Sequence, residues 1–209
     1  MNRRQLGQKF ARLTTDVVIR YPRLWRVFRP LTRRQFDAIA AEWDEMRMEG
    51  HLAPYERALE AVEPAPVRAL DLGTGTGQGA FAIARRFPNA EVVGVDLAER
   101  MLDEARAKTP SELRDRIRFE PADASALPYG DASFQLVAHA NMIPFFDELA
   151  RVLAPRGQAL FAFSGGASTP IYVTPERLRE ELARRGFTDF AEFAAGNGTA
   201  LLARKGDRA

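Results

Sequence analysis

The sequence predicts an α/β fold in which helices cover both faces of a mostly parallel β-sheet. Short apolar runs alternate with helix-like runs along most of the chain, as parallel strands with crossover helices require. The first apolar run, 69–72, leads into a glycine-rich turn at 73–79 and then into a helix-like run at 81–86. A second strand-like run, 90–96, ends in a carboxylate. These features predict a strand, a turn that approaches a ligand closely, and a helix N-terminus.

The glycine-rich turn is the strongest local signal. Gly73, Gly75 and Gly77 occupy alternate positions, so the backbone can pass close under a ligand where a Cβ atom would collide. Asp96 ends the second predicted strand, nineteen positions after Gly77. In doubly wound folds a carboxylate at this place accepts hydrogen bonds from ribose hydroxyls. We therefore expect a nucleoside beside Asp96, which could also cap the helix predicted at 99–107.

Two cofactor classes fit this turn: a nicotinamide dinucleotide and S-adenosylmethionine (SAM). Residues 75–80 satisfy the dinucleotide pattern G-x-G-x-x-A. Asp71, however, lies two positions before Gly73, where a carboxylate repels a pyrophosphate and attracts the amino group of SAM. The segment 71–77, Asp-Leu-Gly-Thr-Gly-Thr-Gly, resembles motif I of the class I SAM-dependent methyltransferases. SAM is therefore the cofactor that we expect.

Two further segments resemble this family. Residues 36–44 are similar to the segment F-D-x-I-A-x-x-Y-D that precedes motif I in ubiquinone and menaquinone biosynthesis methyltransferases. In that comparison Trp43 replaces an aromatic residue that lies over the methionine end of the cofactor; a tryptophan buried under the helical cap is the alternative. Residues 145–155 resemble the signature E-x-x-R-V-L-K-P-G-G, although Arg156 replaces its first glycine. In the fourth predicted strand the family pattern is F-D-x-V, and Gln135 stands where this pattern has an aspartate.

The resemblance covers residues 36–205. It implies a Rossmann-like, seven-stranded mixed sheet that is parallel except for an antiparallel last strand, with helices on both faces and an N-terminal helical cap. We divide the chain into a basic helical arm and cap, 1–60, and a SAM-binding methyltransferase domain, 61–209. The remaining strands are expected at 116–120, 133–138, 158–163, 188–194 and 199–204, and a last helix at 175–185.

The same comparison points to the residues of the site. Asp123 follows the third strand and resembles the family position that hydrogen-bonds the adenine amino group; an Asx-turn is the alternative. His139 ends the fourth strand and is the best placed general base, although a histidine satisfied within the fold is an equal alternative. The residues expected to contact the cofactor are Asp71, Gly73, Thr74, Gly75, Gly77, Asp96, Leu97, Met101, Asp123 and Ala124, and those expected to contact the acceptor are Trp43, Asn141 and Tyr172.

The composition limits the other chemistry that the chain can carry. It has 209 residues, no cysteine and two histidines, which leaves little material for a metal site and none for thiolate catalysis. No apolar run approaches the roughly 18 residues of a membrane span, and the first residues lack the apolar core of a secretory signal. We expect one globular domain and a cytoplasmic location.

The N-terminal arm is unusually basic. Residues 1–36 contain ten Arg and Lys against a single acid, Asp16. We expect a basic amphipathic helix that Pro22 and Pro30 break into pieces. Such an arm could cap the cofactor cleft, mediate the formation of a homodimer or lie on an anionic membrane. Contact with nucleic acid is the least favoured of these roles. Its apolar residues recur at intervals of three and four: Leu6, Phe10, Leu13, Val17, Tyr21, Leu24, Phe28 and Leu31.

The expected function is SAM-dependent methyl transfer to an O, N or C nucleophile of a small molecule. Quinone precursors and phenols both fit a small, flat, partly apolar acceptor. Two alternatives are a catalytically silent SAM-binding regulatory protein and an NAD-dependent oxidoreductase. A nucleic-acid methyltransferase is disfavoured because Asn-Met-Ile-Pro at 141–144 stands where such enzymes carry N/D-P-P-Y/W.

Overall fold

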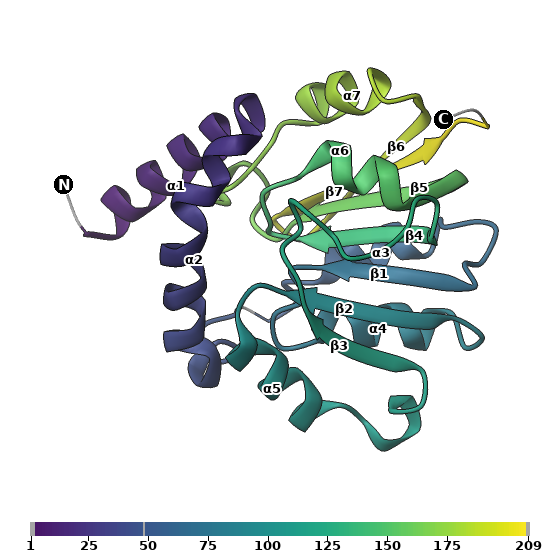
Figure 1. The fold of residues 1–209 in the computed structure, drawn as a ribbon, viewed down its shortest axis with the longest axis horizontal. Helices are drawn as coiled ribbons and strands as arrows, with labels where there is room; N and C mark the ends of the chain where they lie inside the picture. The colour runs from purple at the N-terminus through teal and green to yellow at the C-terminus, as the bar shows by residue number, and fades with distance from the viewer. Residues whose placement is uncertain (1–2, 48, 208–209) are drawn as a thin grey trace.

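The strands of the computed structural model, which describes residues 3–47 and 49–207, form one seven-stranded sheet in the order β3-β2-β1-β4-β5-β7-β6 (Figure 1). The first five of these strands pair in parallel, whereas β7 is antiparallel to both β5 and β6. The predicted fold is therefore confirmed, including its antiparallel last strand. The strands are β1 Arg68–Leu72, β2 Glu91–Asp96, β3 Ile117–Pro121, β4 Phe134–Ala140, β5 Leu153–Phe163, β6 Phe187–Ala195 and β7 Gly198–Lys205.

The helices form two layers around the sheet and a separate N-terminal arm (Figure 1). Helices α1 and α2 of the arm lie beyond the carboxyl ends of the parallel strands, and α2 runs across these ends. The α-helices are α1 Arg3–Arg20, α2 Trp25–Ile39, α3 Ala53–Leu59, α4 Gln78–Arg86, α5 Glu99–Lys108, α6 Phe146–Val152 and α7 Pro175–Ala183, and the 3-10 turns are Pro22–Leu24, Ala40–Glu42, Ser111–Leu113 and Gly166–Ser168.

The core follows from the alternation of side chains along the strands. Ala69 of β1 packs with α3 and α4 on one face, whereas the next residue, Leu70, packs with α6 and α7 on the other. Both residues are fully buried. Because both faces of the central strands are covered, these strands are apolar throughout rather than alternately polar. The ligand-facing positions are thus confined to the strand ends.

The arm departs from the prediction at Pro30. Pro22 does separate two helices, since α1 ends at Arg20 and Pro22 begins a 3-10 turn. Pro30, however, lies inside α2, so the expected break there is wrong. Proline removes one helical hydrogen bond, to the carbonyl of Arg26. The packing of α2 against the domain, where Trp25 is 7% exposed, outweighs this loss.

The predicted apolar stripe of the arm is only partly buried. Val18 and Trp25 pack against Phe145 at the end of the sheet. Leu13 and Leu31, in contrast, are 63% and 60% exposed. The side chains of Leu6 and Phe10 lie outside the described part of the structure. In the described ranges no helix combines the length and the apolar character that a membrane crossing needs.

Strand β5 begins earlier than the range 158–163 predicts. It starts at Leu153 and contains a bulge, because its pairing with β4 shifts register between Phe134 and Leu136. Arg156, which replaces a family glycine, has a positive φ of 61°. A Cβ atom on Gly157 would lie 2.9 Å from the carbonyl oxygen of Ala154, so glycine is required there.

Gly94, in the middle of β2, offers a test of the packing under the glycine-rich turn. A Cβ atom at this position would lie 2.7 Å from the ring of Phe119 and 2.9 Å from Thr74 Oγ1. We expect Gly94→Ala to lower the free energy of unfolding by about 1–3 kcal/mol through overpacking, measured by denaturant unfolding. Gly130→Ala is the control, since a Cβ atom on Gly130 would lie 3.6 Å from its nearest neighbour, Ser133 Oγ, which is an ordinary contact distance. Equal losses in both variants would contradict this account.

Candidate functional site

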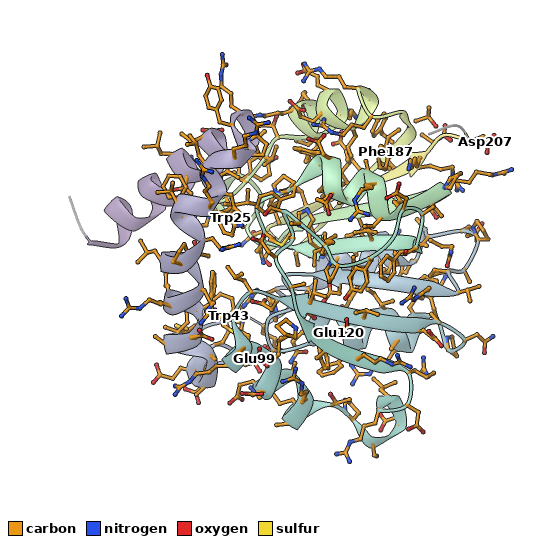
Figure 2. The ribbon with its side chains drawn as sticks, in the orientation of Figure 1. Trp25, Trp43, Glu99, Glu120, Phe187 and Asp207 are labelled. Carbon is orange, nitrogen blue, oxygen red and sulfur yellow. The ribbon has the colours of Figure 1, made fainter. Side chains whose placement is uncertain are left out.

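A cavity of about 250 Å³ lies where β1, β2 and β4 end, beneath the N-terminal arm. Its floor contains Gly73, Gly75 and Asp96, and its roof includes Trp25 and Phe36 of α2. Figure 2 shows Trp25 and Trp43 between α2 and the ends of the strands. A smaller cavity of about 30 Å³ adjoins it and shares four of its lining residues, Trp43, Arg47, Gly73 and Ala140. This is the position at which open α/β sheets bind ligands.

Asp71 anchors the glycine-rich turn from below. It is 2% exposed, and its carboxylate accepts hydrogen bonds from the hydroxyls of Tyr55 (2.9 Å) and Thr74 (2.6 Å). Burial raises the pKa of Asp71 to about 6, although the hydrogen bonds from Thr74, Tyr55 and the N–H of Ala80 lower it. A Cβ atom on Gly79 would lie 2.7 Å from this carboxylate, so only glycine lets the helix begin so close.

The backbone N–H groups of the turn are largely used within the protein. The N–H of Thr74 donates to the carbonyl of Val95, and that of Gly77 donates to Thr74, both at 2.9 Å. The N–H of Gly75 donates to Asp96 Oδ2, also at 2.9 Å. A pyrophosphate would need such groups as donors. With three of them occupied and two carboxylates nearby, the turn is poorly suited to a dinucleotide.

Asp96 closes the turn onto the second strand. Its Oδ1 accepts the N–H of Ala98 at 2.9 Å, and Ala98 is itself the N-cap residue of α5. Asp96 is thus not the helix cap, a further role that the sequence suggested for it, because the helix begins at Glu99, three residues later. Burial raises the pKa of Asp96, while the N–H groups of Ala98, Gly75 and Leu97 lower it. The residue lines the cavity.

Asp123 joins the cavity to the arm. Its Oδ1 accepts the indole N–H of Trp25 at 2.9 Å and the hydroxyl of Ser125 at 2.7 Å. Its Oδ2 forms an ion pair with Arg29 at 3.0 Å. Burial alone would raise the pKa of Asp123, but the hydrogen bonds from Ser125, Arg29 and Trp25 together lower it. Asp123 also bonds to the N–H of Ser125, so the predicted alternative, an Asx-turn, is present.

Trp43 covers the turn from the arm side. Its Nε1 would lie 3.4 Å from a Cβ atom on Gly75, and the guanidinium of Arg47 lies 4.3 Å from the centre of its ring. Burial lowers the pKa of Arg47, while the charge of Asp44 raises it. Asp44 fixes this segment, since it accepts the hydroxyl of Thr76 at 2.6 Å and pairs with Lys108 at 2.9 Å.

Comparison with known proteins agrees with this geometry. Residues 69–157 match a family described as a methyltransferase domain. A malonyl-[acyl-carrier protein] O-methyltransferase of Halorhodospira halophila is 40% identical over 163 residues, 73% of this chain and 51% of the relative. The ubiquinone/menaquinone biosynthesis C-methyltransferase of Desulfotalea psychrophila is 29% identical over 180 residues, 84% of this chain and 69% of the relative. The chain contains a class I SAM-dependent methyltransferase domain.

Solved structures place the methyltransferase domain in the same fold. Human N-acetylserotonin methyltransferase in complex with SAM aligns with a TM-score of 0.61 and 20% identity, over 74% of this chain and 52% of that one. The family match and the curated relatives confirm the family and the cofactor predicted from the sequence, and the solved structure confirms the fold. The chain spans about half the length of the first curated relatives that it matches, with 51%, 44% and 47% of their lengths covered.

Most of the residues expected to contact SAM surround the two cavities of the methyltransferase domain. Asp71 and Thr74 line the smaller cavity, together with Gly73. Gly77 lines neither, because it is packed against Phe81 and Phe119 with a φ of 89°. The expected cofactor residues that line the larger cavity are Gly73, Gly75, Asp96, Leu97, Met101, Asp123 and Ala124. SAM fits this lining, which offers carboxylates for hydroxyl and amino groups and apolar side chains for a flat ring.

His139 lies in the core of the domain rather than in either cavity. Its side chain is 0% exposed, and its ring packs edge-on against Phe161, 4.7 Å between centres. Neither ring nitrogen has a hydrogen-bond partner among the described residues. Burial lowers the pKa of His139 to about 3, so the imidazole is neutral. His139 lines neither cavity, whereas the sequence predicted a position close to the transferred methyl group.

The two other candidates for acceptor contact differ from each other. Asn141 lines the cavity, but its amide donates to Ser164 Oγ at 2.7 Å and accepts the N–H of Ser164 at 2.9 Å. With a φ of 53°, it fastens the end of β4 to the end of β5. Tyr172 packs against Phe163 and does not line the cavity, whereas its neighbour Ile171 does.

Apart from Trp43, the sequence did not reveal the residues that the arm contributes to the cavity. Thr14 of α1 and Thr32, Gln35 and Phe36 of α2 line the cavity. Thr14, Thr32 and Gln35 belong to no motif, and Phe36, although it begins the resembling segment 36–44, was not singled out. The position of all four depends on how the arm packs against the domain. Arg47 was also missed, since it lies three positions beyond Asp44, where the resembling segment ends, and belongs to no motif.

Replacing His139 tests whether it acts in the reaction. We expect His139→Leu to leave the free energy of unfolding unchanged or to raise it by about 1 kcal/mol, because it removes buried polar atoms without partners. SAM affinity, measured by calorimetry, should stay within about twofold. Loss of SAM binding or of methyl transfer in a variant that remains folded would show that His139 does reach the site.

Proposed function

We propose that the protein is a SAM-dependent methyltransferase that acts on a small-molecule acceptor. In this proposal residues 61–209 hold the cofactor, and residues 1–60 form an arm that caps the cleft. The observation that supports it most directly is the cavity of about 250 Å³ between the glycine-rich turn and α2, lined on one side by Asp96 and Asp123. When bound, SAM supplies an electrophilic methyl group.

The proposed cofactor contacts use the carboxylates at the strand ends. Asp96 accepts hydrogen bonds from the ribose hydroxyls, and Asp123 accepts one from the adenine amino group. Gly73 and Gly75 let the ligand approach the backbone, and Asp71 below them attracts an ammonium group. Trp43 covers this end of the site and, together with Phe36, excludes water from it.

The acceptor side of the cavity offers no general base. Among the described residues that line it, the ionisable side chains are Arg47, Asp96 and Asp123. We assign both carboxylates to the cofactor, and His139 does not reach the cavity. Helices α1 and α2 of the arm contribute only hydroxyl, amide, indole and apolar groups to the lining. The protein therefore favours an acceptor that is already a nucleophile without losing a proton.

A carboxylic acid meets this requirement best. Its carboxylate is ionised near neutral pH, since an ordinary carboxyl group has a pKa of about 4, and methylation of its oxygen releases no proton. Arg47 provides a positive charge where the two cavities meet, which attracts such an anion. The relative from Halorhodospira halophila is named for O-methylation of a malonyl group, which carries a carboxylate. A quinone precursor, suggested by the relative from Desulfotalea psychrophila, is the second candidate.

Titration calorimetry with SAM tests the cofactor site. We expect Asp96→Ala to weaken SAM binding about tenfold or more, a loss of about 1.4 kcal/mol, because the ribose loses its acceptor. Asp96→Asn keeps one acceptor oxygen and should lose less. Glu91→Ala, at the exposed amino end of the same strand, is the control. Binding of NADH in place of SAM would instead support an oxidoreductase.

An acceptor screen tests the substrate class. We expect transfer of a radiolabelled methyl group from SAM to small dicarboxylic acids and their thioesters, with a rate that is flat between about pH 6 and pH 9 because the acceptor is already ionised. Arg47→Met should lower kcat/KM for acids about tenfold, whereas Arg57→Met, on an exposed part of α3, should not.

Three results would contradict the acid acceptor. Turnover of phenols or amines alone, with a rate that rises with pH, would assign another acceptor class. Unchanged kcat/KM in Arg47→Met, with weaker SAM binding, would place Arg47 on the cofactor side. Tight SAM binding without turnover of any acceptor class would support the silent regulatory alternative.

A membrane or homodimer contact of the arm is a separate proposal, which depends on the side of α2 that faces solvent.

A further inference from the structure

Helix α2 and the turn before it carry an apolar surface that faces solvent, which we call the outer face. Its residues are Leu24, Val27 and Leu31, which are 41%, 65% and 60% exposed. Their spacing of three and four residues places them on one side of a helix. Most of the large apolar side chains that the described residues expose lie on the arm, since Leu13 and Tyr21 are also exposed, at 63% and 54%.

The outer face is distinct from the face that packs on the domain. Trp25 and Thr32 each follow an outer-face residue by one position, which is about 100° around the helix. Both line the cavity, and Trp25 is 7% exposed. Helix α2 is therefore apolar on two sides, and the folding of this chain buries only one of them. A helix that serves only as a cap needs one apolar side.

Cations border the outer face. Arg23, Arg26 and Arg34 form no ion pair with any residue that the structure describes. The single acid among residues 1–36, Asp16, is paired with Arg177 of α7. The guanidinium of Arg20 lies against the ring of the exposed Tyr21, 5.6 Å from its centre. The surface thus combines exposed apolar side chains with positive charge that this part of the chain leaves uncompensated.

Three occupants can be compared by these properties. A second copy joined through the same face would bring like-charged arginines together, because a symmetric dimer pairs each patch with itself. Nucleic acid would pair with the arginines but leave Leu24, Val27 and Leu31 exposed to water. An anionic bilayer surface both buries the apolar side chains and neutralises the cations, since the acyl chains contact the apolar residues and the headgroups pair with the arginines.

We propose that the outer face of α2 binds the surface of an anionic lipid membrane. The contact is peripheral, with the helix lying in the interface. It does not depend on methyl transfer, because no outer-face residue lines the cavity. It would set α2 between the bilayer on one side and the cavity on the other.

Sedimentation with vesicles tests this proposal. The full chain is mixed with extruded vesicles of phosphatidylcholine alone or of phosphatidylcholine with phosphatidylglycerol, and the bound fraction is measured without SAM. We expect binding to the anionic vesicles only, with a decrease of about tenfold or more when salt rises from low to high concentration.

Variants separate the apolar and charged contributions. Val27→Glu combined with Leu31→Glu should lower binding to anionic vesicles about tenfold or more, and Arg23→Glu combined with Arg34→Glu should do the same. Val67→Glu is the matched control, since Val67 is 71% exposed and precedes β1, away from the arm. It should leave vesicle binding unchanged. Circular dichroism and SAM titration verify that each variant is folded.

Several outcomes would overturn the proposal. The proposal is wrong if the protein does not bind anionic vesicles. It is also wrong if Val67→Glu lowers vesicle binding as much as the variants of the arm do. A dimer detected by light scattering that Val27→Glu with Leu31→Glu dissociates would assign the outer face to a second copy. Binding of a DNA duplex that depends on Arg23 and Arg34, without vesicle binding, would assign it to nucleic acid.

Discussion

The buried carboxylate of Asp71 is the constraint on which the cofactor side of the structure depends. It links four parts of the chain: β1, which carries it, Tyr55 of α3, Thr74 of the glycine-rich turn and the first turn of α4 at Ala80. A buried carboxylate is costly unless donors surround it, and three donors are supplied here. Because Gly79 lets α4 start beside the carboxylate, the turn, the helix and the strand hold one another in place.

The fold could be predicted because its signals are local. The apolar runs and the glycines lie within a few residues of the elements they determine, and the parallel sheet follows from their alternation. The course of the arm could not be predicted in the same way. Pro30 is a helix breaker by local criteria, yet α2 continues through it because Trp25 and Phe36 on either side pack against the domain. Such tertiary packing is not visible in a local pattern.

The same distinction applies to the site. Gly73, Gly75 and Asp96, which motif and position along the chain predicted, line the cavity. His139 was misplaced because strand side chains alternate between faces, so a difference of one residue changes the environment completely. Ala140 lines the cavity, whereas His139 beside it lies against Phe161 in the core. The residues of α1 and α2 that close the cavity could not be predicted, since only the packing of the arm against the domain brings them there.

The contacts of Asp123 have a consequence for how the arm and the cofactor site communicate. A carboxylate offers about four lone-pair positions. Three donors already converge on Oδ1, the indole of Trp25 and the N–H and hydroxyl of Ser125, while Oδ2 accepts Arg29 alone. A further donor from a ligand thus has room at Oδ2, beside the guanidinium. Whatever shifts the arm changes the acceptor strength that this oxygen presents, and by reciprocity a ligand on this oxygen biases the arm to the same extent. If the proposed cofactor contact forms at Oδ2, the two oxygens of this carboxylate would link the roof of the cavity to its ligand.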